Sequence, residues 1–95
     1  MEYLFDLGLS LEEINSLKSK YDKKVVEKLE FFPRLVKENY NYLKSYGINN
    51  IKICFINHVN MFFMNPDKFR SIFNKYDRAD LVRCIEKNDA VLEKL

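Results

Sequence analysis

The sequence contains two nearly equivalent segments, and this internal repeat is the feature that most restricts its fold. Residues 3–9, YLFDLGL, match residues 42–48, YLKSYGI. A single offset carries Tyr3, Leu4, Gly8, Ile14 and Leu17 onto Tyr42, Leu43, Gly47, Ile53 and Ile56. Spacings of this size are typical of small helical repeats, in which each unit buries its apolar side against a neighbour. The repeat therefore predicts stacked pairs of helices.

Start and stop signals divide the chain into short helices. Ser10 precedes Glu13 by three residues and opens an apolar series, which is the pattern of a capping box. Gly8 and Gly47 stand where helices end, because the residue after a helix often adopts a left-handed conformation. Pro33 either ends one helix or starts the next. The signals predict helices at residues 2–7, 11–20, 23–32, 34–46, 51–57 and 66–76, and from 78 towards 92.

No segment alternates with a period of two for long enough to predict a strand. A third, fainter copy sets Phe69, Ile72, Tyr76 and Ile85 against Tyr40, Leu43, Gly47 and Ile56. About three units are needed for a stable stack of repeats. We therefore predict an all-α fold, a short right-handed, solenoid-like stack of about three helical repeats with roughly six to seven short helices. At 95 residues it forms one domain, residues 1–95.

The sequence lacks the signals of several protein classes. No run of about 18 apolar residues is present, so we expect no membrane-spanning segment. The start resembles neither a signal peptide nor a transit peptide, which predicts a cytoplasmic protein, and Met1 favours a complete small chain. Cys54 and Cys84 lie far apart without a Cys-x-x-Cys pair, so we expect reduced, buried thiols and neither a metal nor a cofactor.

Catalysis is not expected either. His58 is the only histidine, and no nucleophile or orienting carboxylate lies near it in the sequence. Its position near a helix end favours a capping role. The two glycines are both helix stops, which leaves no glycine loop for phosphate binding. We therefore predict that the protein is not an enzyme.

Several short motifs resemble the mitochondrial transcription termination factor (mTERF) family. The residues that carry the resemblance are Phe32-Pro33-Arg34-Leu35-Val36, Tyr42-Leu43, Tyr46-Gly47-Ile48, Asn60-Met61-Phe62-Phe63 and the segment Leu7 to Ile14. Asn60 stands where the family motif has proline, and Tyr76 stands where it has glycine. The resemblance implies a curved superhelix of helical repeats that binds double-stranded nucleic acid through a basic concave face.

The positive charge of the chain is concentrated in its centre. Residues 31–78 carry eight Lys and Arg against three acids, although the whole chain has a net charge of only +2. Rows of positive charge on predicted helices neutralise phosphates, whereas a mixed charged surface is also ordinary for a soluble protein. We predict that a duplex phosphate backbone is contacted, without sequence reading, by the eight basic residues Arg34, Lys37, Lys44, Lys52, Lys68, Arg70, Lys75 and Arg78.

A second hypothesis is a protein-interaction adaptor. Most of the aromatic residues fall at core spacing, but Phe62 and Phe63 lie in the expected loop between Met61 and Met64. If they are exposed, they form an anchor for a protein partner. If they are buried, they form an apolar plug between two helix pairs. The adaptor receives a partner helix in an apolar groove or at this loop.

Overall fold

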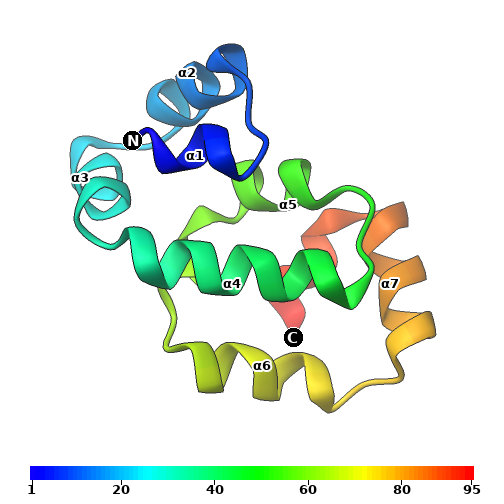
Figure 1. The fold of residues 1–95 in the computed structure, drawn as a ribbon. Coiled ribbons are helices and arrows are strands. Elements are labelled where there is room, and N and C mark those ends of the chain that lie inside the picture. Colours follow the sequence, from blue (N-terminus) through cyan, green and yellow to red (C-terminus); the bar gives the residue numbers. More distant parts are fainter.

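The protein consists of helices and connecting turns, with no strand (Figure 1). The computed structural model describes all residues, 1–95. The elements are α1 (Tyr3–Asp6), α2 (Leu11–Lys20), α3 (Lys23–Phe31), α4 (Pro33–Tyr46), α5 (Ile51–Asn57), the 3-10 helix η1 (Val59–Phe63), α6 (Pro66–Asn74), α7 (Arg78–Lys87) and the 3-10 helix η2 (Asp89–Lys94). The all-α prediction is confirmed.

Local capping explains where most of the helices begin. The Ser10 hydroxyl accepts from the backbone N–H of Glu13 at 3.1 Å, and the Glu13 carboxylate accepts from the N–H of Ser10 at 2.8 Å. This is the predicted capping box. The side chains of Asn65 and Asp77 cap α6 and α7 by accepting from backbone N–H groups of the first turn, without the reciprocal bond. Asn50 precedes α5 without capping it, and its side-chain Nδ2 donates to the carbonyl of Ile85 in α7.

The glycine turns explain where α1 and α4 end. Gly8 and Gly47 have φ values of 100° and 108°, in the left-handed region that side chains with a Cβ rarely adopt. No other residue has a positive φ. The turn after α6, where Tyr76 replaces the glycine, is therefore built differently, as the sequence predicts.

Gly47 provides a direct test of this turn. Gly47→Val should lower the free energy of unfolding by at least ~1 kcal/mol, because a β-branched residue fits poorly in the left-handed region. A Cβ at Gly47 meets no atom within 4 Å, so the cost is conformational rather than steric crowding. Gly47→Asn is the control, since Asn tolerates this region better. Urea unfolding measures both, and equal midpoints for Gly47→Val and wild type would contradict this role of Gly47.

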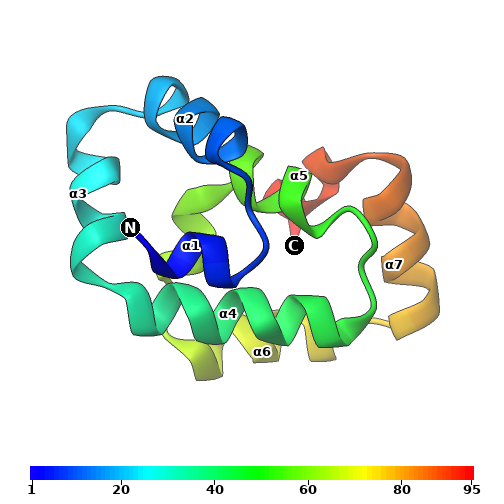
Figure 2. The same ribbon diagram turned by 45° about the horizontal axis from the view of Figure 1, so that its top comes forward.

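The helix α4 organises the rest of the molecule. It is the longest helix, with 14 residues, and it crosses the centre of the structure (Figure 1). It packs against α3, α5, α6 and η1. Both views place α3 and α7 at opposite ends of the molecule (Figures 1 and 2). The radius of gyration is 12.8 Å, with extents of 35 × 25 × 22 Å, near the value of about 12 Å for a compact chain of this length.

An aromatic cluster forms the centre of the core. The rings of Phe55 and Phe62 meet edge to face with centroids 5.0 Å apart, and Tyr40 lies 5.4 Å from Phe55. Phe69 and Phe73 extend the cluster from α6. All five side chains are fully buried or nearly so. Because they come from α4, α5, η1 and α6, the cluster joins the elements that lie on either side of α4.

The order of the elements contains one recurring pattern. Two α-helices followed by a 3-10 helix occur as α4–α5–η1 and again as α6–α7–η2, and α1–α2 precede them. The helix α4 packs against α6, and α2 packs against α5. The single helix predicted from residue 78 towards 92 is divided into α7 and η2, because Asn88 is extended and its side chain caps Ala90.

The predicted equivalence is wrong by one position after the turn. The cap Asn50 follows its glycine by one residue more than Ser10 follows the glycine of the first unit. Ile14 is buried, whereas its predicted counterpart Ile53 is 52% exposed and Cys54 is buried in its place. Because the loop after Gly47 is one residue longer, the buried position of α5 falls one residue later than a single offset predicts.

Candidate functional site

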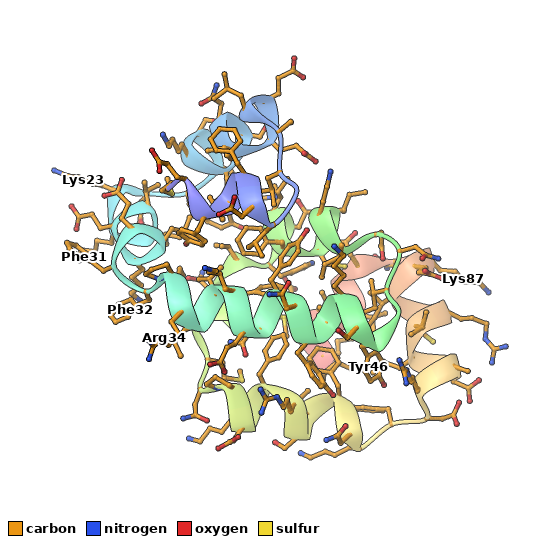
Figure 3. All side chains as sticks on the ribbon, in the orientation of Figure 1. Lys23, Phe31, Phe32, Arg34, Tyr46 and Lys87 are labelled. Carbon is orange, nitrogen blue, oxygen red and sulfur yellow. The ribbon has the colours of Figure 1, made fainter.

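The structure brings three of the predicted basic residues to one open cavity between α4 and α6. The cavity has a volume of about 610 Å³ and is lined by Arg34, Lys37 and Arg70 together with Pro33, Glu38, Asn41, Tyr42 and Ser45. We call this cavity the α4–α6 groove. Arg34 projects from the first turn of α4 (Figure 3). The groove therefore presents three cations against one carboxylate.

The amphipathic pattern of α4 explains why its cations face the groove or the solvent. Val36 and Leu43 are fully buried, and Arg34 and Lys37 lie on the opposite, exposed side of the helix. Neither of these two basic side chains forms an ion pair. Their charges are therefore free to meet an anionic ligand.

Arg70 reaches the groove from α6 and is already engaged. Its guanidinium lies 3.7 Å from the Glu38 carboxylate and 3.6 Å from that of Asp67. The same group lies 5.9 Å from the centre of the Tyr42 ring, close enough for a cation–π contact. Both carboxylates are largely exposed, so these ion pairs contribute little stability. A phosphate group therefore competes for Arg70 at low cost.

Arg78 lies beside the groove in a structural role. A second cavity of about 400 Å³ shares Tyr42 and Ser45 with the groove and includes Arg78. The guanidinium donates to the carbonyl of Tyr46 and to that of Ser45, each at 2.8 Å. These carbonyls are free at the C-terminus of α4, where a cation is favourable. Arg78 therefore caps α4 and links it to α7.

The other four predicted residues do not join the groove. Lys44 lies on the exposed side of α4, two turns after Lys37. Lys52 of α5 contacts Glu13 of α2 at 3.6 Å. Lys68 precedes Arg70 by two residues, which places the two side chains on nearly opposite sides of α6, and Lys75 follows Lys68 on its side. Only three of the eight predicted residues therefore meet in the groove, and contact of the other residues with a duplex stays a prediction.

Phe62 does not form the predicted exposed anchor. Residues 59–63 are the 3-10 helix η1, not a loop, and Phe62 has no exposed area. The prediction of a partner-binding role is wrong for Phe62, which is part of the apolar plug that the alternative describes. Phe63 is partly buried, and the ammonium group of Lys28 lies 5.8 Å from the centre of its ring. Phe62 therefore supplies no free surface, and Phe63 supplies only a partly exposed ring.

A polar cluster that the sequence analysis missed surrounds His58. Its Nε2 lies 2.8 Å from Asp89 Oδ2, and its Nδ1 lies 3.4 Å from Glu93 Oε1. The Asn57 amide donates to the same Asp89 oxygen at 3.1 Å. Hydrogen bonds from Asn57 and His58 hold the pKa of Asp89 below its usual value. The cluster ties η2 to the end of α5, and its partners lie more than 30 residues apart in the sequence.

The two cysteines have different surroundings. Both are free; Cys54 is buried and Cys84 is exposed, so the prediction of two buried thiols is wrong for Cys84. Burial raises the pKa of the Cys54 thiol to about 12, and the negative charge of Asp89 contributes to the shift. A thiol with such a pKa stays protonated at neutral pH and is a poor nucleophile.

The chain matches no protein-family model, no curated protein and no solved structure. None of its helices has the length and apolar character that crossing a membrane requires.

Proposed function

We propose that the protein binds the phosphate backbone of a duplex nucleic acid through the α4–α6 groove. Arg34 and Lys37 supply unpaired charges, and Arg70 exchanges its exposed carboxylate partners for phosphate oxygens. The observation that carries the proposal is the meeting of these three side chains in one open cavity. Backbone contacts of this kind position a protein on a duplex without reading its sequence.

The proposal includes the arrangement of the repeats. We infer that α1–α2, α4–α5–η1 and α6–α7–η2 are three units of a short right-handed stack of the mTERF type. The recurring element order and the pairing of α4 with α6 and of α2 with α5 support this inference. The groove then lies between the first helices of two successive units, and its role is binding rather than catalysis.

Salt dependence of binding tests the proposal. Three phosphate contacts predict a slope of about −2.7 for log K against log salt concentration, at roughly −0.9 per contact. Titration of a fluorescently labelled duplex by anisotropy measures this slope. The triple variant Arg34→Gln, Lys37→Gln, Arg70→Gln should lose most of the affinity and most of the slope. Absence of binding by the wild type even at about 50 mM salt would end the proposal.

The chain offers a control with the same change in net charge. Lys52→Gln, Lys68→Gln, Lys75→Gln also removes three positive charges, at positions outside the groove. We expect this variant to keep the slope of the wild type, because only long-range attraction is reduced. An equal loss of slope in both triple variants would show that the groove has no special role.

The adaptor hypothesis is favoured by a different observation. A cavity of about 380 Å³ at the end of the molecule has a largely apolar lining, formed by Tyr76, Asp77, Asp80, Leu81, Cys84, Val91 and Leu95. We call it the α7–η2 cavity. It replaces the segment 61–64 as the place where a protein partner would bind, because apolar hollows at a surface are typical of interaction sites.

A further inference from the structure

Glu38 is the only acidic residue that lines the α4–α6 groove. It belongs to α4, and its carboxylate lies 3.7 Å from the guanidinium of Arg70 on α6. The contact therefore spans the groove from one helix to the other. Both side chains remain accessible, with 47% of Glu38 and 44% of Arg70 exposed. A ligand that enters the groove meets this ion pair directly.

The helical period places Glu38 on the same surface as the unpaired cations of α4. Arg34 precedes Glu38 by four residues, which brings both side chains to one side of the helix. Lys37 is the preceding residue and also lines the groove. A base that precedes an acid by four residues is the less favourable order for an ion pair on a helix, and Arg34 forms none. The carboxylate therefore lies among all three cations that the proposed function assigns to phosphate.

A carboxylate and a phosphate compete for the same donors, because both accept from the N–H groups of a guanidinium. The distance of 3.7 Å between Glu38 and Arg70 is longer than a hydrogen bond, so this ion pair opens easily. A phosphate that reaches Arg70 also approaches the negative charge of Glu38, which repels it. Glu38 therefore opposes an anionic ligand both by occupying Arg70 and by repulsion.

We propose that Glu38 is an internal competitor of the ligand, which neutralises Arg70 in the free protein and lowers the affinity of the groove for a phosphate backbone. Binding then requires the Glu38 carboxylate to move away from Arg70. Without this carboxylate, the net charge of the lining side chains rises from two to three positive charges. The inference rests on the proposed function and names the residue that limits its strength.

Asp67 provides a matched comparison, because it contacts the same guanidinium at 3.6 Å. It lies three residues before Arg70 on α6, its side chain is 93% exposed, and it does not line the groove. The charge of Asp67 therefore stays in water when a ligand fills the groove, where solvent and salt screen it. Asp67 should oppose the ligand much less than Glu38 does.

Binding of a fluorescently labelled duplex, followed by anisotropy at about 50 mM salt, tests the role of Glu38. Glu38→Gln keeps the size of the side chain and removes its charge. We expect this variant to bind about fivefold more tightly than the wild type, which corresponds to the upper range for an exposed ion pair. Its salt dependence should stay that of the wild type, because the same phosphates are contacted. Asp67→Asn makes the same change in net charge and should gain at most about twofold.

A double-mutant cycle with Arg70 separates competition from a general effect of charge. In the Arg70→Gln background, Glu38→Gln should raise the affinity by at most about twofold, because the competitor no longer has a cation to neutralise. Thermal unfolding verifies that each variant is folded.

The outcomes distinguish this inference from the proposed function. If the wild type binds the duplex and Glu38→Gln binds with the same affinity, Glu38 is not a competitor, although the groove still binds phosphate. An equal gain from Asp67→Asn, or an equal gain with and without Arg70, would also overturn the inference. Absence of binding by the wild type at about 50 mM salt ends the proposed function itself.

Discussion

Replacing Phe62 with alanine should lower the free energy of unfolding by about 3–5 kcal/mol, the range measured for buried aromatic residues. The ring is fully buried and packs against Phe55 and Phe69, with centroids 5.0 and 5.5 Å away. Removing it leaves a cavity where α4, α5 and α6 meet. Since a domain of this size has a total stability of roughly 5–14 kcal/mol, the loss is a large share of the total. Urea unfolding followed by circular dichroism measures it.

The adjacent residue supplies a matched control. Phe63→Ala removes the same ring from a partly buried position beside Lys28. We expect it to cost less, about 1–2 kcal/mol, because part of the ring is already in contact with water. Equal costs for the two substitutions would mean that η1 does not orient Phe62 inwards as described.

The second large effect concerns Asn39, the only buried polar residue of the chain, with 1% of its surface exposed. Its amide nitrogen donates to the carbonyl of Phe62 at 2.9 Å and to that of Met64 at 2.8 Å. Asn39→Leu keeps the approximate size but removes both donors. A buried carbonyl without a partner costs about 1–3 kcal/mol. Leucine also removes the Asn39 Oδ1, which is buried without a partner, so we expect a net loss of about 2–4 kcal/mol.

Two comparisons make this prediction specific. Asn41→Leu changes the same residue type on the exposed side of α4, and we expect a change within about 0.5 kcal/mol. Asn39→Gln retains the donor group but lengthens the side chain, so it should cost less than Asn39→Leu only if η1 shifts to meet it. If Asn39→Leu unfolds at the urea concentration of the wild type, the two hydrogen bonds are not important for stability.

The parts of the fold that were predicted correctly depend on short-range chemistry. The Ser10 capping box, the glycine turns and the proline starts each involve residues within a few positions of one another. Such signals act through backbone conformation and local hydrogen bonds, which the sequence contains directly. The same holds for the amphipathic face of α4, whose buried residues follow the helical period.

The α4–α6 groove depends on how two helices pack together, which local sequence patterns do not show. A helical period shows that Arg34 and Lys37 face away from the core, but not which helix packs beside them. Arg70 joins them only because α6 lies along α4, and Lys68 is excluded because two residues on a helix point in nearly opposite directions. The same limit explains why eight basic residues were grouped when only three meet in the groove.

Contacts between distant residues were missed for a related reason. Asn39 and His58 find their partners 23 to 35 residues away, and nothing in the local sequence distinguishes them from surface residues. Phe62 and Phe63 are adjacent and chemically identical, so only the direction of η1 determines which of them is buried. A difference of one residue in loop length likewise placed Cys54, not Ile53, in the core.

Because Cys54 is buried and Cys84 is exposed, the reactivity of the two thiols reports how often the protein opens locally. A chromogenic disulfide reagent should consume one thiol per folded molecule, since Cys84 is accessible, and a second only when α5 detaches from the centre of the structure. The rate at which this second thiol reacts then follows the population of locally opened molecules, so that individual amides need not be measured. Fluctuations around the aromatic cluster are thus measurable in the unmodified chain, without a dye or an added tryptophan.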